Sequence, residues 1–370
     1  MSLRIAQVAP LLESVPPTLY GGTERVVSYL TEEQVRAGFD VTLYASADSV
    51  TAGRLRPQSP RALRLDGQRP DPLADHLVML DQVFREADQY DVIHLHTDYL
   101  HLPLASRCAT PTITTLHGRL DLARIRRIFR TFRALPFVSI SVAQRAPMPW
   151  LNWTGTVHHG LPPDLHTFVP SPEPYLAFLG RISPEKGVDR AIEIAIRVEM
   201  PLRIGAKVDP MDREYFEAVI RPLLDHPLVE YLGEIGGVDK DALLGNATAL
   251  LFPISWPEPF GLVMIESLAC GTPVIAFPCG SVPEVLRDGE TGLLVRSVEA
   301  AASAVRDVGT LDRRRCRAEF EARFSARRMA DDYLTLYRRL TEDPDEGRRF
   351  HSDRKRARSA FRTSPVRPAG

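Results

Sequence analysis

Cysteine is scarce in this sequence, and long apolar runs are absent from it. The 370 residues include four cysteines, without a C-x-x-C pair or a Cys/His ligand spacing, which argues against a disulfide framework and a zinc site. No segment approaches the run of about 18 apolar residues that suggests a membrane-spanning helix. The first apolar run is broken by Pro10, Glu13 and Pro16 and is too short to resemble a signal peptide. We therefore expect a cytoplasmic protein.

An excess of charge of one sign is also missing. Lys and Arg total 46 and Asp and Glu 47, so the net charge is -1, which disfavours a nucleic-acid-binding protein. Hydrophobic residues make up 44% and charged residues 25%, close to the average of globular proteins, so the chain can bury a substantial core. At about 150 residues per domain, a chain of this length is expected to form two domains.

Short apolar runs alternate with amphipathic helical stretches in the first part of the chain. The β-rich runs lie at 4–10, 40–46, 91–97, 111–117, 136–142 and 155–160. Runs that are apolar on both faces are typical of buried parallel strands. The order of strand, helix and strand predicts a doubly wound α/β domain over residues 1–161.

A proline-rich stretch interrupts this alternation. Residues 162–174 contain five prolines, which excludes a central strand or a helix interior and predicts an interdomain linker. The alternation then resumes, with an expected helix at 211–224, and predicts a second doubly wound domain over residues 175–325.

The last part of the chain divides in two. Residues 326–340 place apolar side chains on one helical face, which predicts a closing helix. Residues 341–370 are polar and charged, with eight Lys or Arg between Arg348 and Arg367, so we expect a disordered basic tail.

Open α/β sheets bind ligands beyond the carboxyl ends of their strands, so the residues after each expected strand are candidates. Gly21 and Gly22 precede a helix and either form an ordinary turn or let backbone N–H groups approach an anion. His117 follows another strand and is the better candidate for contacting a substrate. His94 and His96 share a strand face, but a metal pair there is disfavoured because no third ligand or D-x-D element is evident.

The second domain carries the more informative pattern. Arg181 and Lys186 flank a turn before a helix, and two cations beside a helix N-terminus suit a diphosphate. Glu258 stands ahead of a later helix, whereas Glu266 lies inside it, where a carboxylate could accept two hydrogen bonds from a vicinal diol. Taken singly, these residues also fit a solvated loop and a buried ion pair.

Seven motifs follow one another in a single order: YGGTERVVSYL, TLHG, GRISPEKG, EPFGLVMIE, ACGTPVIA, GSVPEVL and DGETGLLV. In this order the sequence resembles the retaining nucleotide-sugar glycosyltransferases of the GT-B fold, family four, over roughly residues 1–340. The resemblance implies two Rossmann-like domains facing each other across a cleft, with the C-terminal helix crossing back to the first domain. It also implies transfer of a hexose-type sugar from a nucleotide-diphosphate sugar to an acceptor hydroxyl, with retention and without a metal or other cofactor.

The resemblance also assigns roles to individual residues. Arg181 and Lys186 would bind the donor diphosphate and stabilise the leaving nucleotide. Glu258 would contact the donor sugar and the phosphate beside it, and His117 would lie near the transferred sugar. These four residues are the predicted catalytic group.

Further residues would hold the donor without taking part in the chemistry. Glu266 would bind the ribose hydroxyls, and main-chain atoms near Glu234 and Ile235 would meet the base. Gly21 and Gly22 would lie near the donor phosphates or the acceptor. Backbone groups would complete the sugar-phosphate contacts at Phe260, Gly261 and Leu262.

Two other functions share parts of this pattern. Sugar-nucleotide epimerases also have paired Rossmann-like domains but lack this order of motifs. A non-catalytic nucleotide-sugar-binding protein would tolerate loss of the four predicted catalytic residues, all of which are present. An NAD oxidoreductase is disfavoured because no G-x-G-x-x-G follows the first strand.

A basic segment at 122–133 combines an apolar stripe with five arginines, Arg124, Arg126, Arg127, Arg130 and Arg133. An ordinary surface helix with solvated arginines explains this pattern. The arginines could instead bind an acidic or phosphorylated acceptor, or bring the protein to an anionic membrane surface as a peripheral protein. The sequence leaves open the donor base, the sugar and the acceptor.

Overall fold

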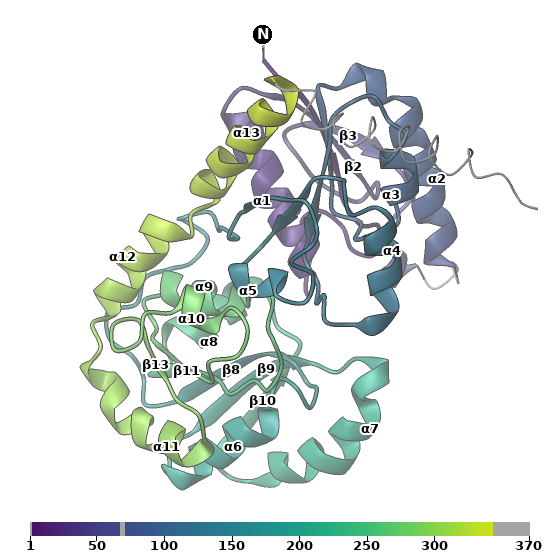
Figure 1. Ribbon diagram of the computed structural model, residues 1–370. Helices are drawn as coiled ribbons and strands as arrows, with labels where there is room; N and C mark the ends of the chain where they lie inside the picture. The colour runs from purple at the N-terminus through teal and green to yellow at the C-terminus, as the bar shows by residue number, and fades with distance from the viewer. Residues whose placement is uncertain (1, 67–70, 343–370) are drawn as a thin grey trace, which may run out of the picture.

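Two parallel sheets form the frame of the protein in a computed structural model that describes residues 2–66 and 71–342 (Figure 1). The first sheet has seven strands in the order β3-β2-β1-β4-β5-β6-β7, and the second has six in the order β10-β9-β8-β11-β12-β13. This confirms the predicted fold class. The predicted basic tail lies outside the described residues apart from its first two, which end the last helix.

The first sheet is built from strands that are mostly buried on both faces, as expected for parallel strands between helix layers. Its strands are β1 (Arg4–Val8), β2 (Asp40–Ala45), β3 (Arg54–Pro57), β4 (Val92–Leu95), β5 (Thr112–Leu116), β6 (Phe137–Ser139) and β7 (Trp153–Thr156). Its helices are α1 (Gly22–Arg36), α2 (Pro72–Arg85), α3 (Leu102–Ala105), α4 (Arg126–Thr131) and α5 (Val142–Arg145). The strand expected at 155–160 begins and ends earlier, so His158 and His159 lie in the loop beyond it.

The second sheet follows the proline-rich stretch 162–174. Its strands are β8 (Leu176–Arg181), β9 (Leu202–Lys207), β10 (Val229–Gly233), β11 (Ala249–Phe252), β12 (Val274–Ala276) and β13 (Gly292–Leu294). Its helices are α6 (Val188–Arg197), α7 (Arg213–Tyr215), α8 (Gly237–Gly245), α9 (Leu262–Ala269), α10 (Val282–Val285), α11 (Val298–Asp307) and α12 (Arg313–Arg323). Residues 1–161 and 175–325 remain our proposed domain limits.

The prediction of a continuous helix at 211–224 is wrong. Short segments replace it, namely α7 between a 3₁₀ turn at Pro210–Asp212 and a π-helical turn at Phe216–Ile220, followed by a 3₁₀ helix at Arg221–Asp225. Pro222 lies in the last of these and cannot donate the backbone hydrogen bond that a regular helix requires there.

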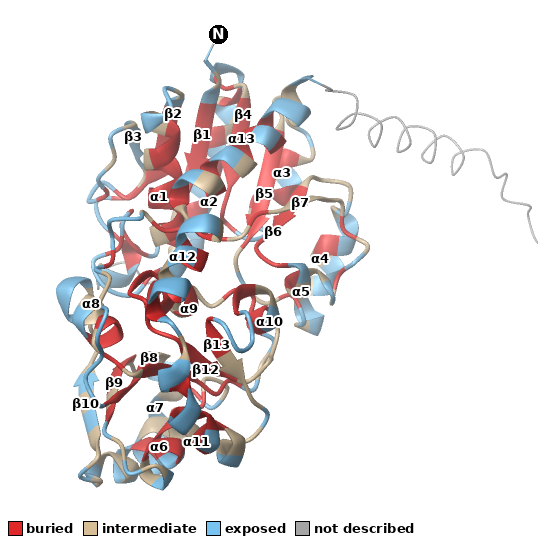
Figure 2. Ribbon diagram, turned by 90° about the vertical axis from the view of Figure 1, so that its left-hand side faces the viewer, coloured by how far each residue is buried: buried red, intermediate tan, exposed pale blue. Residues whose placement is uncertain are grey.

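The closing helix α13 (Ala326–Glu342) crosses back and packs on α1 of the first domain (Figure 1). Its inner face buries Met329, Tyr333 and Tyr337. Figure 2 shows buried residues along both sheets, and one apolar cluster runs from β1 through Phe260 and into α13. The last helix therefore belongs to the core of the first domain although it follows the second in sequence.

Two chain crossings connect the domains, and they are bonded to each other. The Leu161 amide donates to the Phe324 carbonyl at 2.8 Å, and the Ala326 amide donates to the Leu161 carbonyl at 2.8 Å. A Cβ on Gly160 would lie 2.3 Å from the carbonyl oxygen of Ser325. Glycine is therefore required at this crossing because the two backbones approach too closely for any side chain.

Candidate active site

A cleft of about 980 Å³ lies between the carboxyl ends of the two sheets. The predicted site residues from both domains line it, with the exception of Glu234. The Glu234 side chain instead accepts a hydrogen bond from the Tyr20 amide at 3.2 Å, while Ile235 and Gly236 line the cleft. The rule that strand exits meet at one edge thus placed almost every predicted residue in one cavity.

The N-termini of α1 and α9 line this cleft, and the glycines that precede them, Gly21 and Gly261, provide no side-chain cap. Gly21 and Gly261 precede these helices with φ of 148° and 79°, in the region that favours glycine. A Cβ on Gly261 would also lie 2.7 Å from the Met264 methyl group. The free N–H groups and the positive ends of two helix dipoles therefore face the cavity, where they favour an anion.

The predicted phosphate-binding cations lie beside these helix ends, each paired with carboxylates. Arg181 contacts Glu185 at 2.6 Å, Asp212 at 3.4 Å and Asp209 at 3.6 Å. Lys186 contacts Glu258 at 2.5 Å. In the protein without ligand, acids therefore compensate both cations, and an incoming diphosphate must compete with them for the charge.

The second predicted carboxylate, Glu266, is buried in α9 and pairs with Lys240 of α8 at 2.5 Å. Burial alone would raise the pKa of Glu266, but Lys240 and His166 outweigh it and hold this pKa below its usual 4.5. Glu266 is therefore ionised, and a carboxylate can accept more hydrogen bonds than the one from Lys240.

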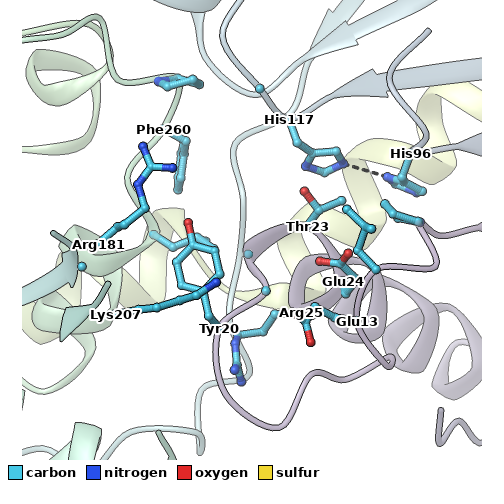
Figure 3. A pocket seen from close by; sticks show the side chains of 18 of the residues that line it. Glu13, Tyr20, Thr23, Glu24, Arg25, His96, His117, Arg181, Lys207 and Phe260 are labelled. Atoms are coloured by element: carbon cyan, nitrogen blue, oxygen red, sulfur yellow. Dashed lines mark hydrogen bonds between the residues drawn. The ribbon is translucent and has the colours of Figure 1, made fainter. Parts of the chain in front are cut away.

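His117 lies on the opposite wall, at the exit of β5 (Figure 3). Its Nε2 is 2.8 Å from Nδ1 of His96, and its ring stacks on His159 at a centroid distance of 5.2 Å. Burial lowers the pKa of His117 to about 3, so the ring is neutral. Its Nδ1 is buried and has no hydrogen-bond partner among the described residues.

The histidine pair that the sequence offered as a metal site is fully occupied by protein partners. His94 bonds to Tyr337 at 2.7 Å and to Thr115 at 2.7 Å, and His96 bonds to His117 and to Gln7. Because both nitrogens of each ring are engaged, neither ring has a lone pair left for a metal.

Known protein families match both domains. Residues 166–323 match the family model of glycosyl transferases group 1, and residues 20–153 match that of Glycosyltransferase Family 4. The chain belongs to these glycosyltransferases.

The relatives of this glycosyltransferase match it over different shares of the chain. Alpha-maltose-1-phosphate synthase of Mycolicibacterium smegmatis is 33% identical over 45% of the chain, and the chain spans about half of that relative, 48% of its length. Phosphatidyl-myo-inositol mannosyltransferase of the same organism is 26% identical over 88% of the chain and 89% of its own.

Solved structures share the fold over nearly the whole chain. AviGT4, a glycosyltransferase involved in avilamycin A biosynthesis, superimposes with a TM-score of 0.72 at 23% identity, covering 92% of this chain and 98% of its own. HepE of Anabaena in complex with UDP-glucose gives a TM-score of 0.69 at 17% identity, covering 92% of this chain and 100% of its own. At these identities the likeness shows the GT-B fold.

The side chains that line the cleft of this glycosyltransferase and that the sequence did not predict include Tyr20, Glu24 and Lys207 (Figure 3). Lys207 lies 4.8 Å from the centre of the Tyr20 ring. Glu24 is 5% exposed and has no hydrogen bond or ion pair with another described residue, and burial raises its pKa from 4.5 to about 7. Tyr20 and Glu24 belong to the motif YGGTE, so their place at a strand exit could have identified them.

One three-residue group among the described residues could hold a metal ion, His166, Asp241 and Cys270. It does not line the cleft. Oδ1 of Asp241 already accepts hydrogen bonds from His166 Nδ1 at 3.0 Å and from the Thr167 amide at 3.0 Å, and lies 3.7 Å from the Cys270 sulfur. These bonds tie the interdomain stretch to α8 and α9, which is a structural role.

The five arginines of 122–133 are all exposed, and none of them lines the cleft. The expected helix is shorter than its pattern, with a 3₁₀ turn at Ala123–Ile125 followed by α4. Phe129 is buried against Phe137, with ring centroids 5.8 Å apart. A separate surface concavity is lined by Arg126, Arg127, Arg130 and Thr131. Among the described residues, no helix is long and apolar enough to span a membrane.

Proposed function

We propose that the chain transfers a hexose-type sugar from a nucleotide-diphosphate sugar to an acceptor hydroxyl, with retention of configuration and without a metal or other cofactor. The observation that carries this proposal is the convergence of Arg181, Lys186 and two uncapped helix N-termini in one interdomain cleft. These cations and backbone N–H groups are hydrogen-bond donors in the number and arrangement that suit a diphosphate.

The chemistry follows from the charges that develop in the reaction. Departure of the sugar leaves an anionic diphosphate, which preorganised cations and N–H dipoles stabilise. As the diphosphate binds, Arg181 and Lys186 exchange their carboxylate partners for phosphate oxygens. Glu258, released from Lys186, then faces the donor sugar, and ionised Glu266 accepts from the ribose hydroxyls.

Retention is proposed from the family resemblance. In that mechanism the acceptor attacks from the face that the diphosphate leaves, and a phosphate oxygen helps to deprotonate the acceptor hydroxyl. The structure of HepE with UDP-glucose supports a nucleotide-sugar donor, because its fold is the same. Main-chain groups of Ile235 and Gly236 would meet the base.

The basic segment 122–133 bears on the acceptor and on the cellular location. The five arginines of 122–133 do not line the cleft, and three of them line a separate surface concavity, which favours a role away from the reacting hydroxyl. We propose that the protein is cytoplasmic and that this patch makes a peripheral contact with anionic lipid or with a distant acidic part of a long acceptor.

A donor screen followed by product analysis tests the proposed function. Binding of UDP, GDP, ADP or dTDP, or of their sugars, should raise the melting temperature by mass action. With the donor known, transfer is assayed with and without EDTA, and NMR identifies the anomer of the product. Activity that EDTA abolishes and Mn²⁺ restores would refute metal independence, and an inverted anomer would refute retention.

A further inference from the structure

A chain of buried polar side chains leads from α13 to the cleft. The hydroxyl of Tyr337 lies 3.1 Å from the amide nitrogen of Gln7 on β1 and 3.2 Å from that of Gln34 on α1. The Gln7 oxygen lies 3.0 Å from Nε2 of His96, whose Nδ1 meets His117. The side chains of this chain that precede His117 are each at most 2% exposed, so water does not compete for their bonds; they are Tyr337, Gln7, Gln34 and His96.

The single hydroxyl proton of Tyr337 determines the direction of every bond in this chain. The hydroxyl has three neighbours, the two glutamine side chains and Nδ1 of His94 at 2.7 Å. If both amide groups donate, the hydroxyl accepts twice and gives its proton to His94, and every group has a partner. If both glutamines were turned, two carbonyl oxygens would face one hydroxyl proton, so one of them would meet the hydroxyl oxygen as acceptor against acceptor at 3.1 or 3.2 Å, which disfavours that arrangement.

The orientation of Gln7 then determines the protonation of both histidines. Because its amide nitrogen faces Tyr337 and Gln34, its oxygen faces His96, whose Nε2 must carry the proton. Burial lowers the pKa of His96 and of His117, so each ring carries one proton. Nδ1 of His96 is therefore an acceptor, and the proton between the two rings belongs to Nε2 of His117.

We infer that α13 positions His117 through Gln7 and His96 and holds it as the Nε2–H tautomer, which leaves its Nδ1 as an acceptor for a substrate hydroxyl. The inference rests on the proposed function in taking the cleft as the sugar site. Stacking on His159 fixes the plane of the ring, and the unpartnered Nδ1 is a buried acceptor that a ligand hydroxyl would satisfy.

This assignment restricts the substrate. A bare imidazole nitrogen accepts a hydrogen bond and repels a second acceptor, so the group that meets His117 must be a hydrogen-bond donor such as a hydroxyl and not a carboxylate. Nucleotide sugars that carry a carboxylate at that position should therefore bind poorly, because the carboxylate and Nδ1 of His117 are both hydrogen-bond acceptors. Gln7 and His96 act as positioning residues because they contact His117 or its partner but do not themselves perform the reaction.

The tautomer is tested on the full chain without any substrate. Long-range ¹H–¹⁵N correlation spectra of histidine-labelled protein at pH 7 show which nitrogen of each ring is protonated, and His117→Asn and His96→Asn assign the signals. We expect both rings to be neutral with the proton on Nε2. A proton on Nδ1 of His117, or a charged ring, would overturn the inference whatever the enzyme catalyses.

The positioning role is tested by kinetics. His96→Phe removes the acceptor for His117, and Gln7→Met removes the carbonyl that orients His96, so kcat/KM for transfer should fall by up to about 10²-fold. Affinity for the nucleoside diphosphate that binds the wild type should not change. His96→Asn keeps an acceptor oxygen near the position of Nδ1 and should restore most of the rate.

A matched control separates positioning from a general loss of buried polar contacts. Thr115→Val removes a hydroxyl that bonds to His94 at 2.7 Å and to Tyr333 at 2.9 Å, in the same network but off the path to His117. It should keep the wild-type rate. Equal losses in Thr115→Val and His96→Phe, or no loss in His96→Phe, would overturn the positioning role. Failure of the wild type to transfer any sugar would refute the proposed function alone.

Discussion

Glu24 is a carboxyl group that the fold buries in the cleft without an ion pair to another described residue, so its replacement by glutamine should change how stability depends on pH. Burial raises the pKa of Glu24 from 4.5 to about 7 in the folded chain. In the unfolded chain the group loses its proton near the ordinary value. Between these two values the folded state holds more protons, so the free energy of unfolding falls as pH rises through this window.

The size of the effect follows from the same shift. The difference between 4.5 and about 7 corresponds to about 3 kcal/mol once the pH lies well above both values. Glutamine has the same shape and does not titrate. The free energy of unfolding of Glu24→Gln, relative to that of the wild type, should therefore rise by about 2.5 kcal/mol between pH 5 and pH 8.

Urea unfolding of both proteins at the two pH values, followed by tryptophan fluorescence, measures this difference. Glu214→Gln, at an exposed position of α7, is the control and should follow the wild type at both pH values. An advantage of Glu24→Gln that does not change with pH would refute the reasoning, because it would mean that the carboxyl is not desolvated. Since Glu24 lines the cleft, we expect the stabler variant to be the slower enzyme.

The other predictions concern the phosphate site, the basic patch and the domain crossing. Arg181→Ala and Lys186→Ala should each lower turnover by about 10²- to 10³-fold, and near-wild-type rates in both would contradict their assignment. If the basic patch binds anionic lipid, Arg126→Ser with Arg127→Ser should abolish co-sedimentation with anionic vesicles and leave that with neutral vesicles unchanged. If the wild type binds no vesicles, the patch is an ordinary surface with solvated arginines. Gly160→Ala should cost about 1–3 kcal/mol in urea unfolding because its Cβ would lie 2.3 Å from the Ser325 oxygen, whereas Gly309→Ala, with no atom within 4 Å, should not be destabilised by overpacking.

Much of the fold could be predicted because it depends on short-range patterns. Apolar runs between helical stretches located most strands, and the rule that parallel strands end at one edge brought Arg181, Glu258 and His117 into one cleft. The helix at 211–224 failed because apolar periodicity outweighed the effect of Pro222. Strand β13 has only three residues, one of them glycine, so it forms no apolar run that marks a strand in the sequence.

The pairing of side chains could not be predicted, because it depends on which elements become neighbours. Lys186 and Glu258 are 72 positions apart, and His96 and His117 are 21 apart. Their contacts require that β8 lies next to β11 and that β4 lies next to β5. The high pKa of Glu24 likewise comes from burial by segments distant in sequence, which a helix-start motif does not reveal.

The two backbone crossings at Leu161 and Ser325 lie side by side and are bonded to each other, so they act as one connection point between the domains. Two connections that are bonded to each other at one point leave the domains fewer ways to rotate than a single connection would. Displacement in such a rotation grows with distance from the axis. The ring of His159 lies next to these crossings in sequence and 4.9 Å from that of Phe260, so in a rotation about the crossings this contact would change less than contacts between more distant walls of the cleft.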